Sequence, residues 1–398
     1  MFNRRKFIKQ SAILSCAPMM PRFVSSSLKN IDSGQSGKVL IVVQLSGGND
    51  GLNTVVPFGD DKYYLARPTM GIRRNELIEL DDRTGFNRAL KAIYPLYMEG
   101  EMTILNHVGY PNPNRSHFRS MDIWQTGGSS DEYLSSGWIG RYLDSECVGC
   151  DRPYHAIEWG DNLSLALQGE QRMGFAMRGL SKLKRTADDV FLNQLGSQYV
   201  TDGNDTHLDF LYKTMTEVQE SAAYIVSKSK KNRSVSSYPD HAFGVGLKQI
   251  AELILAGCDT QIYYIQISGF DTHVNQKARQ GPLLRTYAEG IRALTQDLKN
   301  VGIMQDVLIM TFSEFGRRVE ENASRGTDHG AGNTLFLMGG GLKKPGMYND
   351  GPDLANLLDG DLAHQIDFRS VYANILEDWI GTGYEQVLPK AIPKLDVV

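Results

Sequence analysis

Six carboxylate and imidazole side chains follow the ends of predicted strands or lie in glycine-rich turns. They are Asp50, Asp271, His273, Glu314, Asp328 and His329. The segments that carry them contain no cysteine, and oxygen and nitrogen ligands without sulfur suit zinc, manganese, magnesium or calcium. Histidine ligands favour zinc or manganese, with calcium and magnesium as alternatives. These residue types therefore predict a site for a divalent metal ion.

Two pairs within this set are candidates for metal ligands. Asp271 and His273 lie two residues apart in the segment GFDTH. Side chains at this spacing point to the same side of an extended chain, so both can bind one ion. Asp328 and His329 stand between glycines in RGTDHGAG and have no apolar neighbours to pack against. Asp328 and His329 therefore favour a binding role, whereas Asp271 and His273 taken alone fit a ligand pair or a polar strand end equally well.

The other two carboxylates each have a structural alternative. Asp50 lies in SGGNDG, which is also ordinary turn chemistry. Glu314 lies in SEFGRR, where it can form an exposed ion pair with Arg317 at the start of a helix. Each can therefore be a ligand or a local structural residue.

The segment NRSH at residues 114–117 adds a candidate nucleophile. Ser116 begins a helical pattern, and the backbone N–H groups at a helix N-terminus favour an anion. Its hydroxyl can attack phosphorus or sulfur when a metal activates it, or it can simply cap the helix. Arg115 and Arg317 are candidates to hold the anion through paired hydrogen bonds. His117 is a candidate proton donor or additional metal ligand.

Alternating strand and helix patterns supply the framework for these residues. Ligands of open α/β sheets bind beyond the carboxyl ends of the strands, which is where the candidates fall. The alternation predicts a layered α/β/α fold with a mostly parallel central sheet, and the apolar run at residues 38–45 predicts a central strand buried on both faces. Strands are predicted at residues 38–45, 102–108, 154–158, 261–267, 306–312 and 334–338, and helices at 86–98, 116–126, 188–195, 205–227, 241–256 and 282–300.

Composition excludes several functional classes. The chain has 398 residues, 41% of them hydrophobic and 22% charged, as in an ordinary globular protein. Its formal charge of −4 provides no basic surface for nucleic acid. No run approaches the roughly 20 apolar residues of a membrane-spanning helix. A transporter or a nucleic-acid-binding protein is therefore not expected.

The first 25 residues have the pattern of an export signal. The basic segment RRKFIK at residues 4–9 precedes a short apolar run and resembles a twin-arginine signal. Cys16 is a candidate site for lipid attachment. Residues 26–37 are rich in Ser, Gly and Asp and are predicted to be a linker, which leaves 38–398 as one domain. The protein is thus expected to use the twin-arginine export machinery and to be periplasmic or secreted.

The remaining cysteines carry no metal-site pattern. Cys147 and Cys150 form one C-x-x-C without a second pair, so a loop disulfide is the simpler interpretation in an oxidising compartment. Cys258 follows an apolar helical pattern and is interpreted as a small buried residue.

Five motifs in order resemble the DUF1501 family of exported bacterial proteins, which is placed in the alkaline phosphatase/sulfatase superfamily. The resemblance extends from about residue 38 to residue 379. The motifs are LSGGNDGLNTVVP (45–57), NRSHF (114–118) with Trp124 and Gly127 downstream, GFDTH (269–273), SEFGRR (313–318) and GTDHG (326–330). An alkaline phosphatase-like fold is therefore expected.

The superfamily resemblance implies a site with two metals. Asp50 matches the aspartate after the first strand, and Asp271 and His273 match an aspartate and a nearby histidine of the other ion. Where the superfamily has Asp-His-Gly, this chain has Glu314 followed by Phe315, so that one imidazole is missing and one ion becomes an alternative to two. His329 then corresponds to the last histidine.

A second alignment makes Asp328 and His329 the Asp-His pair, with His364 as the last ligand. It places Asp328 some way beyond the end of its strand, and the first alignment is therefore preferred.

The resemblance implies two classes of function. One is an exported, metal-dependent hydrolase that acts on phosphate or sulfate esters of a small molecule or glycan, with Ser116 as nucleophile. The other is a non-catalytic binding or assembly protein of the cell envelope with a degenerate metal site, which Phe315 motivates. The sequence leaves the substrate, the identity of the metal and the oligomeric state open.

Overall fold

The computed structural model describes residues 37–146, 152–190, 194, 206–229 and 233–398. The chain divides into two units, Met1–Gly37 and Lys38–Val398, and all candidate site residues lie in the second. The predicted signal and linker, Cys16 and the Cys147–Cys150 pair lie outside the described residues. None of the helices in the described part has both the length and the apolar character needed to cross a membrane.

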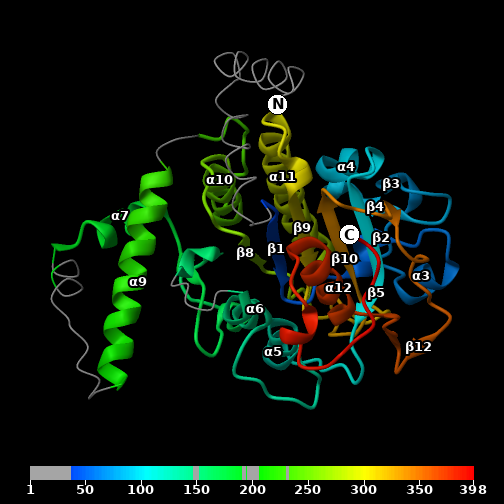
Figure 1. Cartoon of the computed structure of the whole chain (residues 1–398). Coiled ribbons are helices and arrows are strands. Elements are labelled where there is room, and N and C mark those ends of the chain that lie inside the picture. The colour runs from blue at the N-terminus through cyan, green and yellow to red at the C-terminus, as the bar shows by residue number, and fades with distance from the viewer. Residues whose placement is uncertain (1–36, 147–151, 191–193, 195–205, 230–232) are drawn as a thin grey trace, which may run out of the picture. The chain divides into compact units, whose positions relative to one another are not determined.

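The centre of the second unit is a nine-stranded mixed sheet (Figure 1). Its order is β11-β5-β10-β9-β1-β8-β6-β7, and β14 also pairs with β5. β10 is antiparallel to both of its neighbours, and the other pairs are parallel. The strands are β1 (Val39–Ser46), β5 (Met102–Gly109), β6 (Ala156–Trp159), β7 (Phe175–Met177), β8 (Ile262–Ser268), β9 (Val307–Phe312), β10 (Asn333–Gly339), β11 (Gly346–Met347) and β14 (Ile366–Asp367).

β1 lies in the middle of the sheet, between β9 and β8, as its apolar sequence predicts. Successive side chains of a strand point to opposite faces. Ile41 and Val43 accordingly join one hydrophobic cluster, and Leu40 and Val42 join the other. The sheet thus separates two cores, each closed by a layer of helices.

Helices cover both faces, which confirms the predicted α/β/α layering. The first core includes side chains of α4 (Tyr94–Met98), α7 (Leu180–Ala187), α9 (Thr206–Ser229), α10 (Ala242–Leu255) and α11 (Gln276–Asn300). The second core includes side chains of α5 (His117–Thr126), α6 (Trp138–Glu146), α12 (Phe368–Asn374) and the π-helical turn η8 (Ile375–Ile380).

A smaller three-stranded sheet lies beside this framework in the order β2-β4-β3. Its residues and α3 enclose a third hydrophobic cluster. The elements are η2 (Gly51–Asn53), β2 (Val55–Val56), α3 (Asp61–Ala66), η3 (Arg74–Glu76), β3 (Leu77–Glu79), β4 (Gly85–Asn87) and η4 (Arg88–Ile93). The strands β12 (Leu357–Leu358) and β13 (Asp361–Leu362) form a separate hairpin. Short helical turns complete the set: η5 (Pro153–His155), η6 (Leu165–Leu167), η7 (Met304–Asp306) and η9 (Tyr384–Gln386).

Two predicted helices require correction. Residues 86–98 form the end of β4, the turn η4 and the short helix α4, because Pro95 has no N–H to extend a helix from the preceding turn. The helix predicted at 282–300 begins six residues earlier, at Gln276, and includes Pro282. The carbonyl that loses its helical partner belongs to Ala278, which is exposed and accessible to water. Most of the helix predicted at 188–195 lies outside the described residues.

The antiparallel direction of β10 determines where the site forms. β1, β5, β8 and β9 run the same way, so their carboxyl ends lie at one edge of the sheet. β10 runs in the opposite direction, and the segment at residues 313–332 both leaves β9 and enters β10 at this same edge. Asp328 and His329 therefore reach the edge from the start of a strand.

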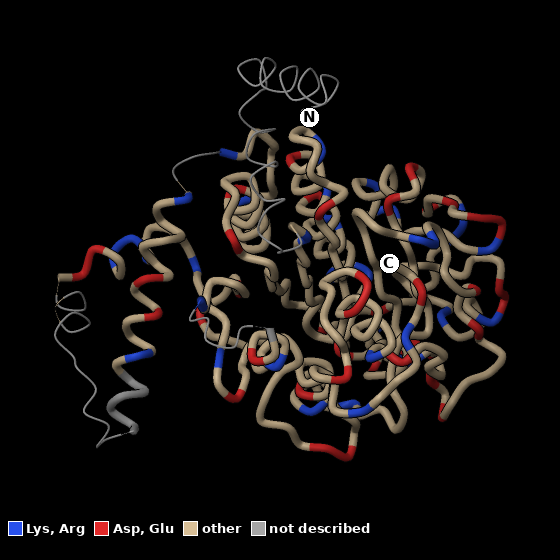
Figure 2. Tube along the Cα trace, in the orientation of Figure 1, with Lys and Arg blue, Asp and Glu red and all other residues tan. Residues whose placement is uncertain are grey.

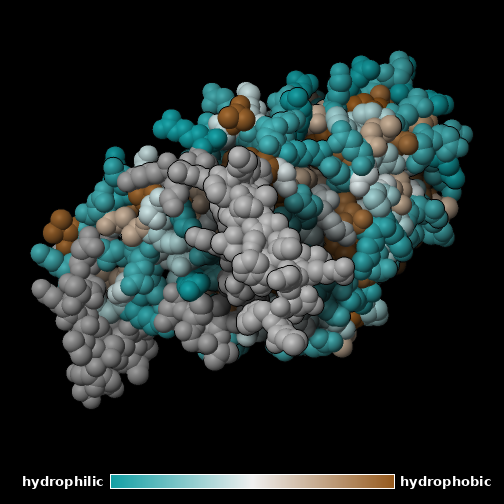
Figure 3. All heavy atoms as spheres, turned by 45° about the horizontal axis from the view of Figure 1, so that its top comes forward, coloured by the Kyte–Doolittle hydropathy of each residue, from teal (hydrophilic) through white to brown (hydrophobic). Residues whose placement is uncertain are grey.

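Charged and apolar side chains on the surface are mixed. Figure 2 shows basic and acidic positions interspersed along the chain, with no broad region of one sign. On the face drawn in Figure 3, apolar side chains appear as separate spots among polar ones. Single exposed apolar residues are normal on globular proteins.

Candidate metal centre

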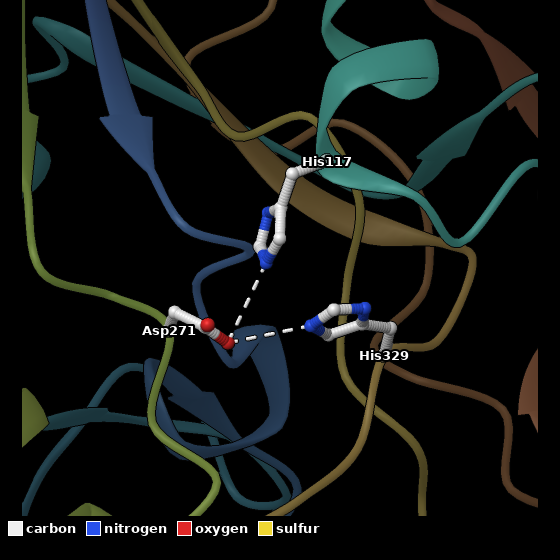
Figure 4. Close-up of side chains that lie close together, drawn as sticks. All are labelled: His117, Asp271 and His329. Carbon is white, nitrogen blue, oxygen red and sulfur yellow. Dashed lines mark hydrogen bonds and ion pairs between the residues drawn. The ribbon is translucent and has the colours of Figure 1, made fainter.

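Three side chains from three separate segments converge at this edge of the sheet (Figure 4). His117 is the first residue of α5, Asp271 follows β8, and His329 precedes β10. Their ligand atoms lie within 4.8 Å of one another. The Nε2 atoms of His117 and His329 lie 3.5 and 3.3 Å from Asp271 Oδ1. The group thus has the donor types of a small metal site.

His273 adds a third imidazole to this group. Its Nε2 lies 3.0 Å from Asp271 Oδ1 and 3.0 Å from His329 Nε2. A tetrahedron with bonds of about 2.0–2.1 Å, the length of zinc–imidazole bonds, has edges of about 3.3 Å. The distances from Asp271 Oδ1 to the three Nε2 atoms, and the distance between the Nε2 atoms of His273 and His329, are 3.0–3.5 Å and lie near that size.

Each imidazole is oriented by an acceptor at its other nitrogen. His117 Nδ1 lies 3.0 Å from Glu314 Oε1, and His273 Nδ1 lies 2.9 Å from Asp328 Oδ1. His329 Nδ1 lies 2.7 Å from the backbone carbonyl oxygen of Arg115. Carboxylate and carbonyl oxygens only accept hydrogen bonds, so each Nδ1 is the atom that carries the proton. Metal-binding histidines are usually held in this way.

This tautomer leaves the Nε2 lone pairs of three neutral imidazoles facing a carboxylate and one another. When His273 and His329 are both neutral with the proton on Nδ1, their Nε2 atoms lie 3.0 Å apart with no proton between them, and Arg317 Nη1 lies 3.5 Å from that of His273. His117 Nε2 is buried without a hydrogen-bond partner. Lone pairs at this separation repel unless a cation or proton lies between them. The donor set therefore fits a divalent ion held by His117, His273, His329 and Asp271.

Arg317 is the positive partner of Asp271. Its Nη2 donates to Asp271 Oδ1 at 2.8 Å, and its other N–H groups donate to the backbone carbonyls of Gly47, Gly48, Phe270 and Thr327. Burial acts to raise the pKa of Asp271, but the hydrogen bond and the positive charge of Arg317 oppose it, and that pKa falls to about 2. Asp271 is therefore ionised over the whole physiological range.

Two imidazoles of the centre have pKa values shifted in opposite directions, one by a carboxylate partner and one by burial. The hydrogen bond to Glu314 raises the pKa of His117. Burial lowers the pKa of His329, which favours its neutral, metal-binding form. The hydrogen bond from His273 lowers the pKa of Asp328.

Glycines allow the loops of the centre to approach closely. Gly47 has φ +119°, and a Cβ there would lie 2.4 Å from the backbone nitrogen of Asp271. At Gly326, a Cβ would lie 2.1 Å from the carbonyl oxygen of His273. Side chains at these positions would push the ligand-bearing loops apart. The glycine-rich motifs are therefore a packing requirement of the centre.

Phe315, which follows Glu314, packs against the imidazoles. Its ring centroid lies 4.9 Å from that of His117 and 4.6 Å from that of His329. It is buried and carries no ligand atom. It thus restrains the two rings but offers nothing to a second ion.

Asp50 lies outside the group of converging ligand atoms, in a buried ion pair with Arg67. The Nη1 and Nη2 atoms of Arg67 donate to Asp50 Oδ2 and Oδ1 at 2.6 and 3.1 Å. The carboxylate also accepts hydrogen bonds from the Gln276 side chain and the backbone N–H of Leu52. Both oxygens are already bonded. A guanidinium group thus occupies the side of Asp50 where a metal ion would have to bind.

Arg115 is bound to a buried carboxylate and not to an open anion site. Its Nε and Nη2 donate to Asp361 Oδ2 on β13. Asp361 is almost fully buried and also lies 3.6 Å from Arg318. Because the Arg115 carbonyl oxygen accepts the His329 Nδ1 proton, Asp361 holds the segment that orients His329.

We therefore expect Asp361→Asn to weaken metal binding without touching a ligand. The change removes the charge that holds Arg115, and loss of such outer partners typically lowers metal affinity about 10- to 100-fold. Titration with zinc in the presence of a competing chelator measures the affinity. Asp353→Asn, at a half-buried carboxylate on the segment that precedes the same hairpin, is the control. An unchanged affinity in Asp361→Asn would show that Arg115 needs no partner to orient His329.

Ser116 is exposed at the N-cap of α5, directly before His117. Its hydroxyl makes no capping hydrogen bond, and its backbone N–H donates to the Asn114 side chain at 2.8 Å. The Ser116 side chain therefore does not cap the helix through a hydrogen bond, and its hydroxyl remains available for a reaction.

Two further histidines do not join the centre. His107 Nδ1 bonds the Ala363 carbonyl oxygen, and its Nε2 accepts the N–H of Asp353. His364 is partly buried near Gly109. Neither histidine belongs to the group of ligand atoms formed by His117, Asp271 and His329.

Sequence reasoning did not identify three residues that shape the centre. Arg67 and Gln276 fix Asp50, and Asp361 fixes Arg115. Arg67 and Asp361 lie outside every motif, and Gln276 differs little from the other polar residues of its helix. Only their contacts across the fold reveal them.

Comparisons with known proteins place the chain in a family. Residues 103–379 match the model of a protein family described as "Protein of unknown function (DUF1501)". A search of curated proteins found no significant match.

Several solved structures resemble the chain at low identity. The phosphonate monoester hydrolase SpPMH from Silicibacter pomeroyi is 10% identical, with 91% of this chain and 78% of that chain covered and a TM-score of 0.43. The PsFucS1 sulfatase from a Pseudoalteromonas species is 14% identical, with 91% and 71% covered and a TM-score of 0.40. The C-terminal periplasmic domain of EcEptC from Escherichia coli is 10% identical, with 91% and 90% covered and a TM-score of 0.41. On the family match, which spans more than half of its length, the chain belongs to the DUF1501 family.

Proposed function

We propose that the protein is a metal-dependent hydrolase of phosphate or sulfate esters that uses one divalent ion. The observation that carries this proposal is the orientation of the three imidazoles, whose Nδ1 atoms bond acceptors while their Nε2 atoms face Asp271. Four carboxylates and three guanidinium groups surround the neutral imidazoles, which leaves a net negative charge for a cation to balance. Zinc or manganese suits this donor set.

The proposal has one metal ion and not two, because the residues expected to bind a second ion are engaged elsewhere or carry no ligand atom. Asp50 is bonded on both oxygens, with Arg67 as its positive partner, and Phe315 provides no imidazole. In the proposal, the Arg67 guanidinium supplies the positive charge that a second metal would have provided. Glu314 and Asp328 act as orienting partners of His117 and His273 and not as ligands.

The proposed reaction is nucleophilic substitution at phosphorus or sulfur. A bound divalent ion would stabilise the negative charge that develops on the ester oxygens. Ser116 Oγ attacks the central atom, the bond to the alcohol breaks, and water then hydrolyses the seryl ester. Arg317, which is buried and fully engaged, keeps Asp271 ionised and oriented and does not contact the substrate.

The experiment that tests this function combines a panel of chromogenic phosphate, phosphonate and sulfate esters with Ser116→Ala. We expect metal-dependent turnover of at least one ester class and a loss of about 10³-fold or more in kcat for the variant, with metal content unchanged. Ser135→Ala is a matched control at another exposed serine. Full activity in Ser116→Ala would assign the attack to water, and absence of turnover with metal bound would remove the hydrolase assignment.

A non-catalytic envelope protein is the second candidate function. It is favoured by Phe315 and Arg67, which take the positions of ligands to a second ion. It shares the prediction of one bound metal and differs in the absence of turnover. We further propose export through the twin-arginine machinery to the periplasm or beyond, on the strength of RRKFIK at residues 4–9, with Cys16 as a candidate lipid anchor.

A further inference from the structure

A second, positively charged pocket lies apart from the metal centre. It has a volume of about 320 Å³ and opens between α11 and the turns η3 and η4 of the small sheet. The turn η4 packs on α11. None of the lining residues belongs to the metal centre. They are Asn53, Ile72, Glu76, Asn87, Arg88, Ala89, Lys277, Gln280, Gly281 and Arg285.

Residues on one face of α11 determine the shape of the pocket. Lys277, Gly281 and Arg285 are four residues apart and therefore lie along the same side of α11. Eight residues of helix span about 12 Å, so the two cations stand at opposite ends of this row. Gly281 separates them, and a Cβ there would meet nothing within 4 Å. The missing side chain thus keeps a hollow open between two positive charges.

The charge of the pocket favours an anion. Arg88 joins Lys277 and Arg285 in the lining, against a single carboxylate, Glu76. Among the described residues, no carboxylate forms an ion pair with any of these three cations. Glu76 is engaged with the backbone N–H of Arg73 at 3.1 Å. Three unpaired cations around one hollow repel one another, and a bound anion would relieve that repulsion.

The uncharged residues of the lining indicate what kind of molecule would bear the anionic groups. The half-buried Asn87 provides an amide, which suits a hydroxyl group, and Ile72 and Ala89 provide apolar contact. The floor is fixed, because Gln280 donates to the backbone carbonyl of Asp50 and Asn87 donates to that of Asn53. We propose that this pocket binds a small hydroxylated molecule that bears at least two oxyanion groups, such as a doubly phosphorylated or sulfated sugar.

Calorimetric titration of the purified protein with fructose 1,6-bisphosphate tests the proposal, with inorganic phosphate and fructose as further probes. We expect saturable binding of the bisphosphate, at least about tenfold tighter than that of phosphate, and none of fructose. The double variant Lys277→Ala/Arg285→Ala should weaken bisphosphate binding at least about tenfold. Higher salt should also weaken it, because the contacts are exposed ion pairs.

Matched variants separate the pocket from general surface charge. Arg279→Ala removes an exposed cation of the same helix that does not line the pocket, and it should leave binding unchanged. Gly281→Met should block the pocket, whereas Gly281→Ala should bind normally because its methyl group meets no neighbour. Thermal melting checks that each variant is folded.

Three outcomes would overturn the proposal. They are no saturable binding at millimolar bisphosphate, equal losses in Arg279→Ala and in the pocket variants, and binding that disappears when chelator removes the metal. The last outcome would assign the anion to the metal centre. Because binding is measured with and without metal, a failure of the hydrolase proposal leaves this test intact.

Discussion

Asp271→Asn and His273→Ala are each expected to lower the affinity for the divalent ion by more than about 100-fold, beyond the usual effect of losing an outer partner. Both residues offer a donor atom to the same centre, 3.0 Å apart. Residues that act as one unit are not additive, so the double variant should bind metal little worse than either single variant. Elemental analysis after gel filtration measures the metal that is retained.

The same centre should contribute to folding stability. An ion that binds only the folded state stabilises it by about 4 kcal/mol when its concentration is 1,000 times the dissociation constant. Chelator should therefore lower the melting temperature of the wild type and leave both variants unchanged. Asp131→Asn, at an exposed carboxylate, should respond like the wild type. A melting temperature that chelator does not change, together with additive effects of the two substitutions, would show that Asp271 and His273 only belong to a polar loop and bind no metal.

Arg67→Met is expected to destabilise the fold by about 3–5 kcal/mol, because it leaves the buried Asp50 carboxylate without its cation. Neither side chain is accessible to water in the native state. In the double variant Arg67→Met/Asp50→Asn no uncompensated charge remains, and much of the loss should be recovered. Urea unfolding measures both values.

The surface pair Arg74–Glu79 provides the comparison, since breaking an exposed ion pair costs far less stability than leaving a buried charge unpaired. A loss in Arg67→Met no larger than that in Arg74→Met would mean that Asp50 is neutral or bound to something other than Arg67.

The sequence predicts the sheet well because its strands are apolar runs. The segment at residues 38–45 appears as β1, and the runs at 102–108 and 306–312 appear as β5 and β9. Burial on both faces of a sheet leaves a local signal that does not depend on distant partners. The segment at 86–98 gave no such signal, since a helical spacing of apolar residues also fits a short strand followed by two turns of different type.

The residues of the candidate centre could be predicted as a set but not in their individual positions. Asp271, Glu314 and Asp328 are all carboxylates after strands or in glycine-rich loops, and nothing in residue type separates a ligand from a partner that orients a histidine. The direction of each strand decides which of these side chains reach the same edge of the sheet. Because β10 is antiparallel, Asp328 and His329 come back to the edge at which β8 ends.

Asp50 is a residue whose role the sequence alone could not predict. Its position after β1 suits a metal ligand, and the sequence contains no sign that Arg67 lies beside it. The two residues are 17 positions apart, and the contact depends on how the loop through α3 folds back. Long-range ion pairs of this kind leave no periodic pattern in a sequence.

X-ray absorption at the zinc edge, on protein loaded with zinc and freed of excess metal, tests the central claim most directly. The account predicts one zinc per chain in a four-coordinate shell of imidazole nitrogens and carboxylate oxygen at about 2.0–2.1 Å, without sulfur. His329→Ala should weaken the imidazole signal, because one of three imidazole ligands is lost, or remove the zinc itself. Two zinc ions per chain, a shell of oxygen alone, or no retained zinc would contradict the assignment of the centre to His117, Asp271, His273 and His329.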